Sequence, residues 1–425
     1  MNRPPHEANV AEQTEHSING GGLKFDYFSP NEKHRFNVFA SAQHINRDSY
    51  YGGGQDPNAY GNTTDLNWMA GSQYVYSFGK CIFMPADLTA GIEFNQDKLE
   101  DNMWGYHRTV DQKVNIGSAF FQNEWKNEHW GFLIGGRLDK HNLIDHVIFS
   151  PRANLRYNPT ENINLRFSYS SGFRAPQAFD EDLHVENVGG NVAMVELADN
   201  LKEERSQSLS ASADIYHRFG AFQVNFLVEG FYTKLSDVFA LTDGEVVDGI
   251  LTRTRYNAPG ARVMGLTLEG KMAYLTKFQV QAGVTLQQSH YSEPHVWNKE
   301  APAVKKMMRT PNTYGYFTAT YTPIKPLSIA LSGTYTGSML VPHEPVPGFL
   351  EKPITVNTKD FFDIGLKAAY DFKLYKSMNL QVNAGVQNIF NAYQNDFDKG
   401  ADRDSGYIYG PSLPRSFFAG VKISY

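Results

Sequence analysis

Several features that define other classes of protein are scarce or absent in this sequence. Its 425 residues include a single cysteine, Cys81, so no disulfide can form within the chain and the redox compartment cannot be inferred. No segment approaches the ~18 consecutive apolar residues of a membrane-spanning helix. The net charge is −6, and no basic block points to nucleic acid. A helical membrane protein is therefore excluded, and we expect no nucleic-acid partner.

Alternation of apolar and polar residues is the feature that the sequence has in abundance. A period of two gives an extended strand one apolar and one polar side. The last residues show it, with apolar side chains at Phe417, Ala419, Val421 and Ile423 and an aromatic end at Tyr425. The same pattern recurs at 147–157, 163–169, 222–229, 278–287 and 378–387. These strands predict an all-β protein whose polar side carries Asn, Gln, Ser, Thr and Arg.

The connections between the expected strands alternate between short and long. The short ones are 30–33, 127–128, 158–161, 276–277, 323–325 and 373–376, and the long polar ones are 46–64, 99–111, 174–201, 292–311, 339–358 and 391–411. A soluble β-sandwich would give the same alternation with its polar face outward. Short turns on one side and long loops on the other are typical of outer-membrane barrels. The sequence therefore predicts a transmembrane antiparallel β-barrel.

The strand count and polarity predict an incomplete barrel. From about Gly20 to Tyr425 we count roughly seventeen strands, with a short first connection and a long last one. An odd number with that polarity fits roughly the last 17 strands of a 22-stranded barrel of the kind with a plugged lumen. No segment resembles a plug domain, so we expect the plug and about five strands to be absent. Residues 1–18 are expected to form a polar N-terminal segment, and residues 19–425 the partial barrel.

Several segments, in order along the chain, resemble the barrel domain of the TonB-dependent outer-membrane receptors. They are 150–159, 164–176, 200–206, 257–269, 385–393 and 414–425. The most specific are Gly172-Phe173-Arg174-Ala175-Pro176 and Asn200-Leu201-Lys202-Glu203-Glu204, in which Glu203 stands where the family usually has proline. In this resemblance the terminal aromatic residue serves as an assembly signal.

The resemblance implies energised uptake of a scarce nutrient across the outer membrane of a Gram-negative bacterium. The expected partners are outer-membrane lipid, a small metal-chelate substrate, and the TonB complex, reached through a plug domain not in this chain. Haem or another iron chelate is the expected substrate, with cobalamin, copper or a glycan as alternatives. No resident cofactor is expected. Met1–Glu7 lacks the apolar segment of a secretory signal, so either a signal and more protein precede residue 1 or the barrel prediction is wrong.

The long connection 174–201 contains the candidate ligand-binding residues. Some haem receptors of the family have a loop that begins with Phe-Arg-Ala-Pro, ends with Asn-Pro-Asn-Leu, and holds a ligand histidine between. Here Phe173–Pro176 matches, Ala198–Leu201 departs at its first two positions, and His184 lies between. A neutral imidazole can ligate haem iron. The candidates are Arg174, Asp180, Glu181, Asp182 and His184.

The acidic triplet Asp180–Asp182 is expected to raise the pKa of His184, which opposes a role of His184 as a neutral ligand. The triplet itself has two interpretations besides binding the chelate. It could bind a hard cation through carboxylate oxygens, or it could be a solvated run of charges.

A second group of loop residues suits a soft metal, although no metal site is assigned. His295, Met307 and Met308 combine imidazole and thioether ligands, which favour copper and similar ions. Catalytic motifs are absent: there is no Gly-x-Ser-x-Gly elbow, His-Glu-x-x-His helix or phosphate-binding glycine loop. We expect that the protein is not an enzyme. An outer-membrane barrel lipase and a soluble β-rich adhesin are the alternatives.

Overall fold

In the computed structural model, residues 3–188, 191–242, 244–375, 377–400, 402–411 and 413–425 are described. Within them, seventeen strands have nine residues or more, in agreement with the predicted number. These wall strands are β1 (Val10–Phe28), β2 (His34–Gly53), β3 (Tyr60–Cys81), β4 (Met84–Met103), β5 (Arg108–Lys126), β6 (Trp130–His141), β7 (Ile148–Thr160), β8 (Ile163–Arg174), β11 (Glu204–Phe219), β12 (Phe222–Leu241), β14 (Ile250–Tyr274), β15 (Phe278–His295), β17 (Thr313–Ile324), β18 (Leu327–Thr336), β21 (Phe361–Tyr375), β22 (Met378–Gln387) and β23 (Ser416–Ser424).

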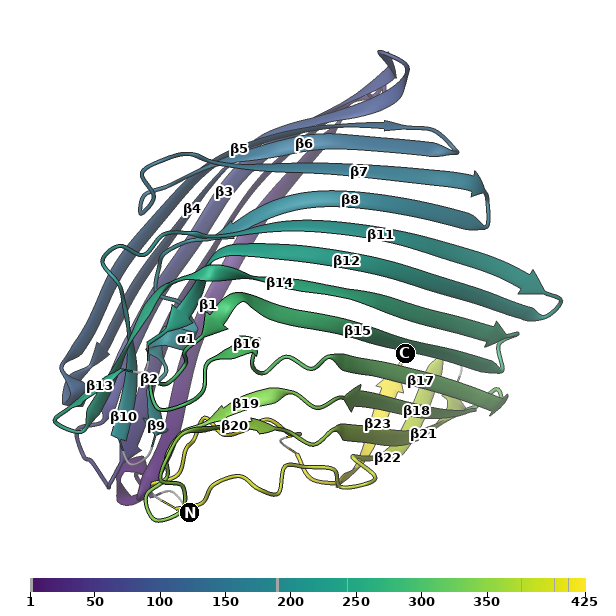
Figure 1. Cartoon of the computed structure of the whole chain (residues 1–425). Coiled ribbons are helices and arrows are strands. Elements are labelled where there is room, and N and C mark those ends of the chain that lie inside the picture. The colour runs from purple at the N-terminus through teal and green to yellow at the C-terminus, as the bar shows by residue number, and fades with distance from the viewer. Residues whose placement is uncertain (1–2, 189–190, 243, 376, 401, 412) are drawn as a thin grey trace.

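Each wall strand pairs antiparallel with the next, which gives one strongly curved sheet (Figure 1). One end of the sheet, which we call the turn end, has only short connections. The other, the loop end, has the long ones, as predicted. No helix among the described residues is long and apolar enough to cross a membrane.

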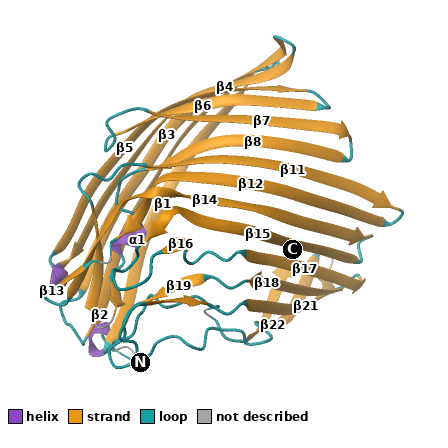
Figure 2. Cartoon of the chain, in the orientation of Figure 1, coloured by secondary structure: helices purple, strands orange, loops and turns teal. Residues whose placement is uncertain are grey.

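The loop end contains all the short elements (Figure 2). They are η1 (Pro5–Glu7), η2 (Trp104–Tyr106), α1 (Asp180–Leu183), β9 (Glu186–Val188), β10 (Asn191–Leu197), β13 (Glu245–Val247), β16 (Val304–Lys306), β19 (Leu340–His343) and β20 (Ile354–Asn357). Strand β10 pairs in parallel with the start of β14, from Val192↔Ile250 to Leu197↔Arg255. The β8–β11 connection is thereby joined to the wall.

The curved sheet is not closed. Within the described residues, β1 pairs only with β2 and β23 only with β22. Side chains along both edges are open to solvent, and Leu23 is 83% exposed and Tyr425 99% exposed. Strand β1 also begins at Val10, whereas the sequence suggested a start near Gly20. It therefore includes residues 10–18 of the expected polar N-terminal segment.

Two predicted loops are largely strand. Residues 46–64 were expected to form a connection, but Asn46 pairs with Thr64 and the ladder continues to Tyr50↔Tyr60. Residues 99–111 behave in the same way, because Leu99 pairs with both Asp65 and Gln112. Polar composition does not distinguish a loop from a strand that extends beyond an apolar zone, since ladder hydrogen bonds need no apolar side chains.

Aromatic rings on the polar face lie over glycines of the neighbouring strand. A Cβ atom on Gly91 would lie 2.4 Å from Cζ of Phe120, and one on Gly385 would lie 2.4 Å from Cζ of Phe418. Only glycine leaves room for these cross-strand contacts. Such pairs help to fix the register of the strands, and they hold the wall that positions the loop end.

Candidate functional site

Helix α1 is held inside the loop end by ion pairs from both sides of the curved sheet. On one side, Arg47 Nη1 lies 2.7 Å from Asp180 Oδ1. On the other, Arg255 of β14 binds the carboxylates of both Glu181 and Asp182. All three acids of the predicted triplet thus have arginine partners, and Glu181 also pairs with Arg174. All three carboxylates are therefore paired with arginine in this structure, and binding of a hard cation by the triplet stays a prediction.

Beneath α1 lies a buried group of charges from β2, β4 and β5. Asp101 is 1% exposed, and its carboxylate oxygens lie 3.9 Å from Arg47 and 3.9 Å from Arg108. Arg108 also donates to the backbone carbonyl oxygen of Asp182 at 2.6 Å. Burial raises the pKa of Asp182, while the Phe179 backbone N–H and Arg255 oppose this rise. These contacts connect the start of the β8–β11 connection to strands that are distant along the sheet.

Apolar packing follows the same path across the interior. Tyr50, Tyr51, Met103 and Tyr106 of the β2–β5 region form a buried cluster with Val185 and Met194 of the β8–β11 connection. Val192 and Ile250 pack against this cluster. The connection therefore spans the loop end from β14 to β2, with α1 on the inner side of the sheet (Figure 1).

His184 lies against the wall at this crossing. Its ring makes an edge contact with Tyr51, with centroids 5.0 Å apart, and its Nε2 lies 3.3 Å from Glu12 Oε2. The hydrogen bond to Glu12 raises the pKa of His184. The predicted direction of the shift is confirmed, but its cause is Glu12 rather than the acidic triplet. A protonated imidazole has no lone pair for iron. Ligation of haem by His184 stays a prediction that this arrangement does not favour.

A cavity of about 330 Å³ lies on the other side of α1 and is the best candidate for a ligand site. It brings together four predicted residues, Arg174, Glu181, His295 and Met308. It does not bring in Asp180, Asp182, His184 or Met307. The remaining lining side chains include Phe239, Arg253, Arg255, Tyr291, Trp297 and Glu344.

The cavity lining combines paired charges with unpaired hydrogen-bond donors. Arg253 Nη2 lies 2.6 Å from Glu344 Oε1, and Asn298 donates to Glu344 Oε2 at 3.0 Å. Burial raises the pKa of Glu344. Arg253 Nε, Arg255 Nη1 and Trp297 Nε1 are buried and lack a hydrogen-bond partner among the described residues. These three donor atoms have almost no accessible surface, so they lie behind the cavity lining rather than opening into it.

His295 and Met308, two of the three residues predicted to suit a soft metal, line the cavity. Burial lowers the pKa of His295, which keeps its imidazole neutral near pH 7. Met307 does not line the cavity, and its backbone N–H donates to the Ser289 carbonyl oxygen. Within the described residues, no group of three or more His, Cys, Asp or Glu side chains could hold a metal ion.

Sequence reasoning missed the arginines of β14. Arg253 and Arg255 stand two positions apart in Leu251-Thr252-Arg253-Thr254-Arg255, so both lie on one face of the strand. Tyr291 and Trp297 were noticeable as aromatic residues beside a loop. Two arginines on the same face of a strand, next to a long loop, would have indicated a site for an anionic group.

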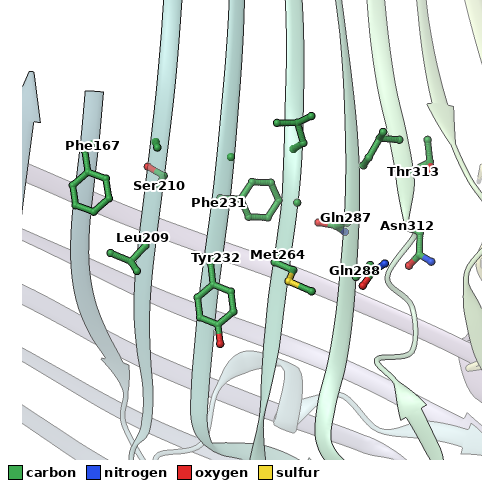
Figure 3. Close-up of a pocket in the computed structure, with 15 residues that line it drawn as sticks. Phe167, Leu209, Ser210, Phe231, Tyr232, Met264, Gln287, Gln288, Asn312 and Thr313 are labelled. Carbon is green, nitrogen blue, oxygen red and sulfur yellow. The ribbon is translucent and has the colours of Figure 1, made fainter. Parts of the chain in front are cut away.

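A larger hollow, of about 850 Å³, lies on the wall away from this site (Figure 3). It is bordered by Phe167, Leu209, Tyr232, Leu266 and Leu286, which are exposed apolar side chains. A Cβ on Gly230, at its centre, would meet nothing within 4 Å. These side chains belong to the apolar face, so the hollow is not part of the polar site at the loop end.

The protein is thus a curved antiparallel wall of strands, with its short turns at one end and a polar cavity among the long loops at the other. The family model for TonB dependent receptor-like β-barrels matches residues 6–389, and the chain belongs to this family. Members of the family are outer-membrane proteins of Gram-negative bacteria. They are transport receptors rather than enzymes, which agrees with the expectation from the sequence. A search of curated protein sequences gave no match.

Solved structures of the same fold include three iron receptors. The siderophore receptor PirA from Acinetobacter baumannii has a TM-score of 0.70 at 15% identity, over 96% of this chain and 62% of that chain. The ferric-catecholate import receptor Fiu from E. coli has a TM-score of 0.70 at 14% identity, over 96% and 64%. The FrpB iron transporter from Neisseria meningitidis has a TM-score of 0.66 at 15% identity, over 96% and 63%. The chain thus spans less than two thirds of each of these structures.

Proposed function

We propose that this chain forms the wall and loop end of a receptor that takes up an iron chelate across the outer membrane, with energy supplied through TonB. Membership of the family and the iron receptors of the same fold support the general function. The single observation that carries it in this chain is the loop-end cavity, which is lined by three arginines and by aromatic rings. Such a lining suits a compact polar ligand.

The proposed cargo is an iron chelate in general rather than haem. The haem hypothesis depended on His184, which lies outside the cavity lining and is hydrogen-bonded to Glu12. The cavity instead presents Arg174, Arg253 and Arg255, which favour anionic oxygen groups.

The finer architecture is also a proposal: the seventeen wall strands correspond to the last seventeen of a 22-stranded barrel. The open edges of β1 and β23 support it, because strands in lipid need partners along their whole length. The coverage of 62–64% of the solved receptors supports it as well. On this proposal, about five strands and the plug, with the segment that contacts TonB, belong to a part of the receptor outside residues 1–425.

Radioactive iron uptake tests the proposed function. A Gram-negative host that expresses the receptor containing this chain, and lacks its own receptors, is supplied with ferric chelates. We expect iron accumulation that depends on the receptor and is lost when TonB is deleted. Accumulation that continues without TonB, or none with any iron chelate, contradicts the proposal.

A further inference from the structure

The loop-end cavity is lined by buried donors that have no acceptor. Arg255 and Trp297 are each 7% exposed, and Arg255 Nη1, Trp297 Nε1 and Arg253 Nε make no hydrogen bond among the described residues. A buried donor without a partner costs about 1–3 kcal/mol, so such groups need an explanation where several occur together. All three side chains line one cavity. The donor atoms themselves have almost no accessible surface, so acceptor oxygens of a ligand satisfy them only where these side chains turn toward the cavity.

The charges around the cavity favour an anion. Three guanidinium groups, those of Arg174, Arg253 and Arg255, face two lining carboxylates, those of Glu181 and Glu344. Glu344 is largely buried and is fixed by Arg253 and Asn298. Its burial disfavours the ionised form. Because Arg255 is also paired with the Asp182 carboxylate, positive charge is in excess at the cavity only once Glu181 has left.

Glu181 occupies the position that an incoming anion would take. Its carboxylate bridges Arg174 and Arg255, yet its side chain is 58% exposed. Arg255 also binds the buried carboxylate of Asp182, so it keeps an anchor if Glu181 leaves. Exposed ion pairs contribute little, typically ~0–1 kcal/mol. An anionic ligand can therefore replace Glu181 at small cost.

The same cavity offers aromatic surfaces. The rings of Phe239, Tyr291 and Trp297 line it, and the Arg174 guanidinium lies 5.6 Å from the centre of the Phe239 ring. Aromatic side chains favour contact with another ring in offset or edge geometry.

From these features, we propose that the cavity binds an anionic oxygen group carried on an aromatic ring of the chelate, between Arg174 and Arg255, where it displaces Glu181. This inference rests on the proposed function and specifies its substrate class. Anionic chelates with aromatic oxygen ligands are preferred over neutral ones.

Two ferric complexes of opposite predicted behaviour test the substrate class. One is the trianionic complex of a hexadentate tricatecholate, and the other is the uncharged complex of a hexadentate trihydroxamate. Binding of each to the detergent-solubilised receptor that contains this chain is measured by titration calorimetry. We expect the trianionic complex to bind at least about tenfold more tightly, as one or two charge-assisted hydrogen bonds provide. Equal affinity for the two overturns the inference and leaves the proposed function standing, whereas no binding of either contradicts the function itself.

Single substitutions test whether Glu181 competes with the ligand, and a remote substitution controls for nonspecific changes in binding. Glu181→Gln removes the competing charge and is expected to tighten binding of the trianionic complex several-fold while leaving the neutral one unchanged. Trp297→Phe retains a ring but removes the Nε1 donor, and Arg253→Gln removes a guanidinium; both are expected to weaken the trianionic complex. Glu128→Gln, at an exposed turn on the opposite end of the sheet, is the matched control and should change nothing. Weaker binding by Glu181→Gln contradicts the proposed displacement.

Discussion

Asp182 differs from its neighbour Asp180 in one respect that decides its importance, namely burial. The Asp182 side chain is 2% exposed, whereas that of Asp180 is 86% exposed, although both pair with arginine. Without the Asp182 charge, the buried Arg255 keeps only the 3.3 Å contact with the exposed Glu181, and loss of a buried partner of this kind costs about 3 kcal/mol. Asp180 is the exposed member of its pair, and the buried Arg47 keeps Asp101 and Thr63 as partners without it, so the expected loss is only about 1 kcal/mol.

We therefore expect Asp182→Asn to loosen the β8–β11 connection and Asp180→Asn to leave it nearly unchanged. Limited proteolysis of the detergent-solubilised protein, with cleavage mapped by mass spectrometry, measures this directly. Cleavage within 175–203 should accelerate strongly in the first variant only. Equal protection in both variants would show that α1 is held by its packing and not by Arg255.

His184 provides a pH-dependent contact between the same connection and β1. Glu12 raises its pKa, with a further contribution from Glu186 and opposition from burial and from Arg47. A folded-state pKa above the ordinary 6.5 means that the contact contributes full stability below that pH. The contribution is lost as the pH rises through the folded-state pKa.

Histidine NMR can test this directly. We expect the His184 ring to titrate above 6.5, and the protection factors for hydrogen exchange in residues 183–186, which correct for the base-catalysed intrinsic rate, to fall as the pH rises through the His184 pKa. Glu12→Gln should lower the His184 pKa and reduce the pH dependence of exchange, while Glu15→Gln, on the same strand, serves as the control. Titration of His184 below 6.5 in the unchanged protein would contradict the contact.

At the scale of elements, the strands were predictable and the interior crossing was not. The alternation at 278–287 is local, and it led directly to β15. The position of 174–201 depends instead on Arg47, Asp101, Arg108 and Arg255, which come from four strands distant in sequence. No local sequence pattern predicts that residues from such distant strands contact one another. Arg174 was identified through its motif, but Arg255, which binds the same Glu181 carboxylate, lies in a strand that carried no motif at that position.

Removal of the crossing element should leave the wall intact. Strand β8 pairs with β11 from Ile163↔Ile215 to Arg174↔Glu204 without help from α1 or β10. We expect replacement of residues 180–197 by a short Gly–Ser linker to preserve the far-ultraviolet circular dichroism of the sheet. The buried rings of Tyr51 and Tyr106 lose their cover from Val185 and Met194, so their nitration by tetranitromethane should rise. As a control, shortening the connection 345–353 should leave the nitration of Tyr51 and Tyr106 unchanged. A collapsed β signal would show that the wall depends on this connection.

At the scale of the whole molecule, the outer face and the two free edges determine behaviour together. Exposed apolar side chains recur along the outer face, among them Ile92, Phe121, Phe149, Leu286 and Phe417. A surface of this kind requires lipid or detergent. The edges add a second requirement, because unpaired backbone groups are not tolerated in the hydrocarbon layer.

The open edges of β1 and β23 predict how the chain inserts into membranes. Expressed alone with a signal sequence, it should fractionate with outer membranes but give heterogeneous species, because each edge exposes unpaired N–H and C=O groups. Addition of the N-terminal part of the receptor should pair both edges and yield a single species that migrates faster unheated than heated in gel electrophoresis. Substitution of Val421 by Pro, which interrupts the β23 ladder opposite Val382, should prevent this conversion. A uniform, heat-modifiable monomer formed by residues 1–425 alone would instead demonstrate that β1 and β23 can pair with each other, and that a seventeen-stranded barrel closes.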